Sequence, residues 1–479
     1  MTGIRLIEIS PVTRVEGHGK VTIHLDADGN VDEARLHIVE FRGFERFIRG
    51  RLMWEVPVIV QRLCGICPVS HHLAAAKAMD QIAGVDVLPP TAEKMRRLMH
   101  YGQVMQSHVL HFFHLSAPDL LFGFGAPAER RNIFEVIREN PTLGLRAIQM
   151  RKFGQEIIEA TAGKKIHGTG AIPGGINRNL PLETRDRFLA QVDEMLAWAQ
   201  DALALARGYV EDHAALVKGF GNFASNHMSL VREGDGALDL YHGRLRALGP
   251  QGTPIFDMVD YCDYHKHLIE DVRSWSYMKF PFIRSLGAED GWYRVGPMAR
   301  MNTASFIDTP LADAAHQALR AFSGGLNHST LANHWARMIE VVHCVEKIRE
   351  LLHDPDLQGT DLVAKGERRF EGIGVIEAPR GNLIHHYKVD EHDQVTFCNL
   401  IVSTTHNNEG MNRAVKAVAV QHLSGQPKIT EGMLNHVEVA IRAYDPCLSC
   451  ATHALGQMPL QVELVGPGGE VIDRAAQCL

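Results

Sequence analysis

Two pairs of cysteines, each with the spacing Cys-x-x-Cys, are the residues of this sequence best suited to chemistry. Cys64 and Cys67 lie in the segment RLCGICPVSHH, and Cys447 and Cys450 lie in DPCLSCATH near the C-terminal end. Two cysteines at this spacing can bind the same metal ion, and four thiolates can complete its coordination. The sequence therefore suggests one four-cysteine metal site, provided that the fold brings the two ends of the chain together.

Three kinds of site fit this pattern. The simplest is structural zinc, although zinc ribbons usually space their pairs by about 15–20 residues and stabilise units that lack a core of their own. The others are a redox-active dithiol and a catalytic metal. The remaining cysteines are scattered singly and predicted to be structural or incidental: Cys262, Cys344, Cys398 and Cys478. The spacing alone leaves the three alternatives open.

The composition is that of an ordinary globular protein, with 45% hydrophobic and 22% charged residues among 479, enough to bury a large core. The net charge of −7 argues against nucleic-acid binding, because that affinity comes mainly from Lys and Arg neutralising phosphates. No apolar run approaches the roughly 18 residues that span a bilayer, and the N-terminus MTGIRLIEIS lacks a secretory signal pattern. We expect a cytoplasmic chain that binds neither nucleic acid nor membrane.

The hydrophobic periodicity predicts a mainly helical α+β fold, with a large helical core and small β elements near both chain ends. Residues 18–39 alternate hydrophobic and polar positions around an Asp-Gly-Asn turn, which is typical of a β-hairpin. The same β pattern appears over 370–405 and in the C-terminal segment LQVELVGPGGEVIDR. From about 57 to 360 the dominant period is helical, with helices expected over 91–122, 182–217, 311–353 and, later, 409–423. No repeat or linker divides the chain, so we expect one compact unit whose two ends meet.

Four segments, in this order, resemble the large subunit of nickel–iron hydrogenases: RVEGHG, RGFE, EAPRG and the terminal DPC-x-x-C-x-x-H. Together with RLCGICPVSHH they extend the resemblance over nearly the whole chain. The resemblance implies the fold of that family and the reversible heterolytic cleavage of hydrogen. It also implies a nickel–iron centre in which Cys64 and Cys447 are terminal nickel ligands and Cys67 and Cys450 bridge nickel to iron. In that family the iron carries carbon monoxide and cyanide.

The resemblance also assigns roles to residues around the metals. Arg380 of EAPRG would place its guanidinium over the open site, and the Thr404 hydroxyl would donate to a cyanide. Ser403 stands where many relatives have proline. Asp119 and Asp445 match acidic residues that surround this arginine, although Asp445 is also a candidate helix N-cap.

Proton transfer and a second metal complete the implied site. His71 matches a histidine that hydrogen-bonds a bridging sulfur. Glu16 matches the first proton acceptor, with a salt bridge to Arg14 as its alternative role. Whether Cys447 or Arg380 is the immediate base stays open, although arginine is hard to deprotonate. Glu45 and His453 match the ligands of a structural magnesium site, for which carboxylate oxygen is suited.

The resemblance implies two parts with different fates. Residues 1–453 would form a single large-subunit domain. Residues 454–479 would be a C-terminal extension that a maturation protease removes after His453 once nickel is in place.

The electrons released from hydrogen would need partner subunits to carry them to an acceptor. No other cysteines show iron–sulfur spacing, and no Gly-x-Gly-x-x-Gly opens a nucleotide-binding unit. We therefore expect an iron–sulfur small subunit and diaphorase subunits with flavin and NAD. The segments EFRGFE, KFP and YDPCLSCATHALGQMP are most similar to the soluble bidirectional NAD-linked hydrogenases, while NADP and a deazaflavin remain alternatives.

Three rival interpretations remain. A quinone-binding respiratory-complex subunit is related by fold, but such relatives lack the four cysteines. A regulatory hydrogen sensor would carry the same centre and turn over slowly. A scaffold protein stabilised by zinc on the four cysteines would contain zinc and no hydrogenase activity.

Overall fold

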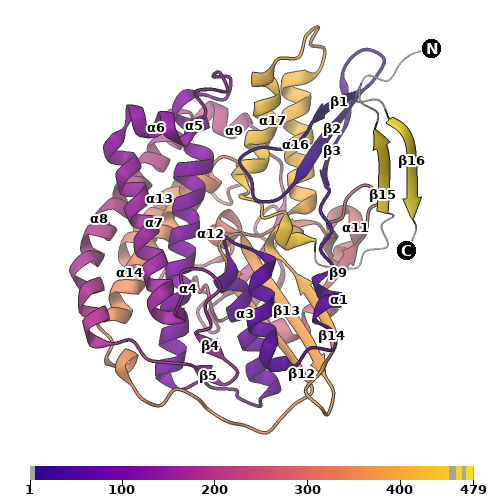
Figure 1. Cartoon of the computed structure of the whole chain (residues 1–479). Coiled ribbons are helices and arrows are strands. Elements are labelled where there is room, and N and C mark those ends of the chain that lie inside the picture. Colours follow the sequence, from indigo (N-terminus) through magenta and orange to yellow (C-terminus); the bar gives the residue numbers. More distant parts are fainter. Residues whose placement is uncertain (1–5, 453–459, 466–470, 478–479) are drawn as a thin grey trace.

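The computed structural model of the chain describes residues 6–452, 460–465 and 471–477, the last two ranges by their backbone. The fold is α+β and mainly helical, as the periodicity predicts. Its longest helices form a bundle, at the left of Figure 1: α4 Pro90–Leu110, α7 Pro141–Ala162, α8 Leu182–Asp212, α13 Pro310–Ser323 and α14 Asn333–Leu352. Within the bundle α4 packs on α7 and α14, and α14 packs on α8 and α13.

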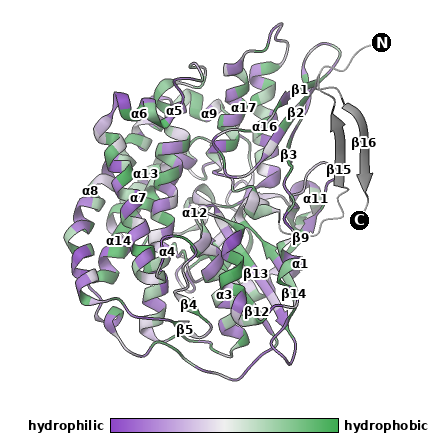
Figure 2. Cartoon of the chain, in the orientation of Figure 1, coloured by the Kyte–Doolittle hydropathy of each residue, from purple (hydrophilic) through white to green (hydrophobic). Residues whose placement is uncertain are grey.

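The helix α8 shows why the sequence folds in this way. Buried residues recur at three- or four-residue intervals, so one stripe of the helix faces the core: Phe188, Val192, Met195, Ala199, Ala202, Ala206 and Val210. Hydrophilic residues alternate with them along the helix (Figure 2). The predicted helix over 182–217 is confirmed, with a break at His213 before the short α9 Ala214–Gly219.

The N-terminal sheet is the element that brings the two ends of the chain together. Its strands β1 Leu6–Ile9, β2 Gly19–Leu25 and β3 Val31–Ile38 are antiparallel, which confirms the predicted hairpin. Strand β3 packs against α16 Asn408–Leu423, which in turn packs against α17 Glu431–Ala443. Since α17 precedes Cys447 directly, the segment around Glu16 is carried to the C-terminal cysteines.

A second sheet carries the segment EAPRG beside the first cysteine pair. It consists of β12 Glu371–Ala378, β13 Gly381–Val389 and β14 Val395–Ile401, as predicted for 370–405. Helix α3 Pro68–Ile82 lies directly on β12, where a Cβ atom at Gly374 would be 2.0 Å from the carbonyl oxygen of Ala74. Gly372 approaches Ala78 in the same way, so helix and strand run in opposite directions. The start of α3, with Cys67, is therefore level with the turn that holds Arg380.

The predicted helical region contains β structure that the periodicity does not reveal. A four-stranded sheet is formed by β6 Asn226–Val231, β7 Arg244–Leu248, β8 Pro254–Val259 and β11 Tyr293–Arg294, and a hairpin by β9 Leu268–Asp271 and β10 Phe280–Ile283. These strands are short and most are separated by glycine- and proline-rich turns, so no window is long enough to show a period. The helical period predicted as dominant from about 57 to 360 therefore does not hold between β6 and β11.

Two predicted helices are also interrupted. Residues 311–353 divide into α13 and α14 because Gly324 and Gly325 adopt positive φ. Residues 91–122 contain a π-helical turn, His111–Ser116, between α4 and α5 Ala117–Phe122, and such turns often occur at functional sites. The predicted helix over 409–423 and the C-terminal hairpin, β15 Leu460–Val465 and β16 Val471–Gln477, are confirmed.

The remaining short elements connect these units. They are α1 Phe44–Ile48, α2 Val56–Ile59, α6 Ile133–Glu139, α10 Tyr264–His267, α11 Gly287–Asp290, α12 Pro297–Thr303, α15 Ser403–His406, β4 Ala171–Ile172 and β5 Gly175–Ile176. Among the helices of the described chain, none has both the length and the apolar character to cross a membrane.

Candidate metal centre

The four cysteines of the two Cys-x-x-Cys pairs meet in the interior. Their sulfur atoms all lie within 4.8 Å of one another, and all four residues are buried. The Cys64 and Cys447 sulfurs are 3.3 Å apart, and those of Cys67 and Cys450 are 3.7 Å apart. The expectation that the chain ends combine their cysteines is met. Cys262, Cys344 and Cys398 are outside this group, and Cys478 lies outside the described residues.

The first pair is placed by the start of a helix. A short 3-10 helix, Val60–Leu63, ends at Cys64, which is extended, and Cys67 is the N-cap of α3 with Pro68 in the first turn. The backbone N–H groups of Ile66 and Cys67 both donate to the Cys64 sulfur over 3.2 Å. Hydrogen bonds from N–H groups favour the charged form of an acceptor, so this loop is suited to hold a thiolate.

The second pair lies in a tight segment after α17. Asp445 has φ +53°, which turns the chain, and Ser449–Ala451 form a 3-10 turn. The Cys447 N–H donates to the Thr404 hydroxyl oxygen over 2.9 Å. Glu16 and Cys447 form a parallel β-bridge. Distant segments, rather than a helix, therefore fix these cysteines.

The Glu16 carboxylate is directed at the site. The Cys447 thiol donates to its Oε2 over 3.0 Å, and the Ser449 N–H donates to the same oxygen over 3.1 Å. The alternative salt bridge to Arg14 is not formed, because Arg14 binds Asp119 instead, at 2.6 Å. A carboxyl group in hydrogen-bond contact with a thiol can exchange a proton with it.

Arg380 is buried beside the sulfurs and held by Asp445. Its Nε donates to the Asp445 carbonyl oxygen over 2.6 Å, and its Nη2 donates to the Asp445 carboxylate over 2.9 Å. Its Nη1 donates to the Ser107 hydroxyl over 3.3 Å, a partner that the sequence motifs do not reveal. Burial acts to lower the pKa of Arg380, but the charges of Asp445 and the cysteine sulfurs outweigh it and raise that pKa well above its usual value. The guanidinium is thus a permanent cation.

Asp119 is not brought to Arg380 in the same way. Its carboxylate accepts hydrogen bonds from Arg14, from Arg442 at 2.7 Å and from the Asn435 amide at 3.1 Å. Of the two aspartates expected around Arg380, Asp445 contacts the guanidinium. Asp119 instead joins the N-terminal segment of Glu16 to α17.

A small cavity with both polar and apolar side chains in its lining lies beside the sulfurs. The cavity has a volume of about 10 Å³ and is lined by Cys67, Ser70, His71, Ala378, Pro379, Arg380, Leu383, Val402, Ser403, Thr404, Cys447 and Cys450. The Ser70 hydroxyl is buried and has no hydrogen-bond partner among the described residues. The His71 Nδ1 is 3.1 Å from the Nε2 of His385, whose Nδ1 is 2.6 Å from the Tyr387 hydroxyl. The Ser403 hydroxyl donates to the Gly381 carbonyl oxygen over 2.7 Å.

The residues present fit a soft transition metal with small polar ligands. Four buried sulfurs match soft metals, and an unpartnered buried hydroxyl next to a cation and a threonine hydroxyl offers donors to a ligand on that metal. Burial raises the pKa of Cys447 and Cys450 well above the usual range of a thiol. It acts in the same direction on Cys64, where hydrogen bonds from the other thiols and the Arg380 charge bring the pKa well below that range.

Of the two residues expected at the second metal site, the structure describes only Glu45. Glu45 is buried, and its Oε1 accepts a hydrogen bond from the Leu400 N–H over 2.8 Å. The Arg42 N–H donates to the Thr452 carbonyl oxygen over 3.1 Å, so the chain passes the Glu45 segment one residue before His453. His453 itself lies outside the described residues.

The comparisons with known proteins agree with this geometry. The sequence model described as nickel-dependent hydrogenase matches residues 42–122 and 249–453, and one described as HoxL-like matches 6–41. The chain is 50% identical to the NAD-reducing hydrogenase HoxS subunit beta of Cupriavidus necator, over 99% of this chain and all of that protein. It is 41% identical to a chain of the F420-non-reducing hydrogenase of Methanothermobacter thermautotrophicus, over 98% of this chain and 99% of that one.

Solved structures show the same relationship. An NAD+-reducing [NiFe]-hydrogenase in the H2-reduced state superposes with a TM-score of 0.92 and 57% identity, covering 94% of this chain and 99% of that chain. The nickel-iron-selenium hydrogenase of Desulfovibrio vulgaris Hildenborough, at 23% identity, shares the fold with a TM-score of 0.75. It covers 94% of this chain and all of that one.

Proposed function

The chain belongs to the nickel-dependent hydrogenase family, and from that premise we propose that it is the catalytic subunit of a hydrogenase whose electrons reach NAD through partner subunits. The single observation that carries the proposal is the set of four buried cysteine sulfurs within 4.8 Å of one another. Support for NAD comes from two relatives named NAD-reducing hydrogenases, with 50% and 57% identity.

The four cysteines would hold a nickel–iron group, with Cys64 and Cys447 on nickel and Cys67 and Cys450 bridging to iron. When bound, this group supplies the Lewis acidity that divides hydrogen into a hydride and a proton. The cavity beside the sulfurs supports carbon monoxide and cyanide on the iron, because Arg380 and the hydroxyls of Ser70 and Thr404 border it.

The residues of this chain would then handle the proton. The contact of 3.0 Å between the Cys447 sulfur and the Glu16 Oε2 supports proton transfer from Cys447 to Glu16. Arg380 would stabilise negative charge over the site as a permanent cation, rather than act as the base, since its guanidinium is held by Asp445 and cannot be readily deprotonated. His71, oriented by its contact with His385, would hydrogen-bond a bridging sulfur.

We extend the proposal to the structural metal and the C-terminal extension. Glu45 and His453 would bind magnesium, which the hydrogen bond between Arg42 and Thr452 supports by placing the two segments together. Residues 454–479 would be removed by a maturation protease after nickel insertion. The partners would be an iron–sulfur small subunit and diaphorase subunits with flavin and NAD, in the cytoplasm.

The test is hydrogen-dependent reduction of NAD, NADP and a deazaflavin by the complex that copurifies with this chain. The proposal predicts rapid reduction of NAD. Reduction of only NADP or the deazaflavin would overturn the acceptor, and very slow turnover with every acceptor would instead indicate a hydrogen sensor.

A further inference from the structure

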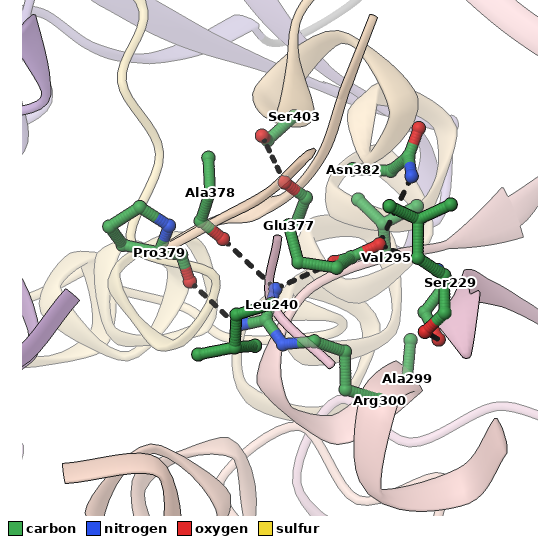
Figure 3. Close-up of polar contacts among 12 residues, drawn as sticks. Ser229, Leu240, Val295, Ala299, Arg300, Glu377, Ala378, Pro379, Asn382 and Ser403 are labelled. Atoms are coloured by element: carbon green, nitrogen blue, oxygen red, sulfur yellow. Dashed lines mark hydrogen bonds and ion pairs between the residues drawn. The ribbon is translucent and has the colours of Figure 1, made fainter. Parts of the chain in front are cut away.

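Arg300 lies on α12, outside the metal centre, and all its N–H donors point at two carboxylates and one short turn. It is fully buried. Its Nε and Nη2 bind the two oxygens of Glu340, each over 2.6 Å, and its Nη1 binds the Glu377 Oε2 over 2.8 Å. The two remaining donors reach the carbonyl oxygens of Ala378, at 2.9 Å from Nη1, and Pro379, at 3.1 Å from Nη2 (Figure 3). All five N–H donors of the guanidinium are therefore used.

The two carbonyls belong to the residues immediately before Arg380. Strands β12 and β13 pair up to Ala378 and Gly381, so Pro379 and Arg380 are a two-residue hairpin turn. Hairpins of this length favour turns with positive φ at the first or both central residues. Pro379 has φ fixed near −65°, and Arg380 is not among the residues with positive φ. This turn is therefore not of the type that two-residue hairpins favour.

Other contacts hold both flanks of the turn. The second oxygen of Glu377 accepts hydrogen bonds from the Leu230 N–H over 2.8 Å and the Asn382 amide over 3.0 Å. The Ser403 hydroxyl donates to the carbonyl oxygen of Gly381. A Cβ atom at Gly296, which has φ +98°, would be 2.9 Å from the Arg380 carbonyl oxygen, so α12 begins directly against the turn. Arg300 lies one turn further along that helix and contacts the turn from the same side.

We infer that Arg300 is a positioning residue for Arg380, which anchors the backbone of the Pro379-Arg380 turn so that the Arg380 guanidinium stays over the four sulfurs. Asp445 holds the Arg380 side chain, and Arg300 holds the backbone from which that side chain extends. The functional consequence rests on the proposed role of Arg380. Buried ion pairs add little to the free energy of unfolding compared with apolar packing. We therefore assign the five hydrogen bonds of Arg300 to fixing the position of the turn rather than to stabilising the fold.

The test is amide hydrogen exchange of residues 376–382 in the purified complex with Arg300→Lys. Lysine keeps the charge but has three donors instead of a planar fork, so the two carbonyls and the two carboxylates cannot all be bound. We expect these amides to exchange roughly tenfold faster and kcat for hydrogen oxidation to fall more than the KM for hydrogen changes, with nickel content unchanged.

Arg96→Lys is the matched control. Arg96 is also fully buried, binds both oxygens of Asp80 and donates to the carbonyls of Ile172 and Gly175. The Arg96→Lys substitution therefore also removes a buried, hydrogen-bonded guanidinium, but at a different segment of the chain. Equal exchange of residues 376–382 in the Arg96 and Arg300 variants would overturn the inference.

A milder variant applies if Arg300→Lys does not fold. Glu340→Gln removes the negative charge that pairs with Arg300. Glu340 contacts Arg300 and His108 rather than the turn. Faster exchange of the amides at 376–382 in this variant would show that loosening Arg300 also loosens the turn. Unchanged exchange would overturn the inference. Arg380→Lys separates the two proposals: an unchanged kcat in that variant would refute the role of Arg380, while the exchange results decide the role of Arg300 independently.

Discussion

The two cysteine pairs have the same spacing but are held by different means. Cys64 and Cys67 precede α3, a helix in which every residue except Gln81 is buried, and backbone N–H groups point at the Cys64 sulfur. Cys447 and Cys450 lie in an irregular segment held by Glu16 and Thr404, which come from opposite parts of the chain. The first pair is thus built by local structure, whereas the second depends on tertiary closure.

This difference gives the sulfurs of Cys64 and Cys447, the two proposed terminal nickel ligands, different chemical surroundings. Donors around Cys64 stabilise a thiolate, while Cys447 contacts a carboxyl group that can take a proton from it. The same difference implies an order of folding. The second pair can reach its final position only after the N-terminal segment and the segment around Thr404 have folded.

The largest expected effect comes from removing the sulfur of either Cys64 or Cys447. Cys64→Ser and Cys447→Ser should both lose nickel and all hydrogen oxidation, because a hydroxyl is a poor ligand for a soft metal. Cys398→Ser is the control, since Cys398 is buried outside the four-sulfur group. Metal analysis and activity measurements check this result, and nickel or activity retained in either variant would contradict a site that needs all four sulfurs.

The next effect tests the proton exchange at Cys447. Glu16→Gln keeps the shape and an acceptor for the Ser449 N–H but cannot take a proton, so kcat should fall by about 10²–10⁴-fold with nickel retained. Glu40→Gln is the matched control, because Glu40 accepts from the Ser449 hydroxyl over 2.8 Å. A kcat equal to that of Glu40→Gln would move the proton route away from Glu16.

Gly17→Ala tests closure of the second pair. Gly17 has φ +83°, and a Cβ atom there would be 2.7 Å from the Ser449 nitrogen. Gly29 has φ +82° with nothing within 4 Å of the same position. Gly29→Ala should lower the free energy of unfolding by about 1–2 kcal/mol through backbone strain alone, and Gly17→Ala by a further 1–3 kcal/mol or so.

Denaturant unfolding measures both glycine variants, and nickel content separates them further. Only Gly17→Ala should reduce nickel incorporation. Equal stability and equal nickel content in the two variants would mean that the contact between Gly17 and Ser449 does not control the site.

The smallest effect is expected at Thr404. Thr404→Val leaves the buried Cys447 N–H without its acceptor, which should cost about 1–3 kcal/mol in the free energy of unfolding. Thr404→Ser retains the hydroxyl and should stay close to the unchanged protein. A loss of equal size in both variants would assign the effect to the threonine methyl group instead.

The sequence predicts the parts of this site that depend on residue type and spacing. Cysteine spacing predicted the four-sulfur group, and alternating hydrophobic residues predicted the hairpin that carries Glu16 to the C-terminal segment. The sequence does not predict the partners that orient these groups, because their contacts form only in the folded chain. Ser107 contacts the Arg380 side chain, and Arg300 contacts the turn that carries it. Tyr387 contacts His385. Asp119, which the motif assigned to Arg380, is diverted to Arg14 and Arg442, and no local pattern distinguishes these arginines as partners.

The most direct test is the metal content of the chain purified with its partners, in a preparation that mass spectrometry shows to end at His453, the proposed processing site. We expect close to one nickel per chain, with X-ray absorption at the nickel edge showing sulfur ligands that decrease in number when Cys447 is replaced by serine. One zinc per chain without nickel, in a sample that lacks residues 454–479, would contradict it.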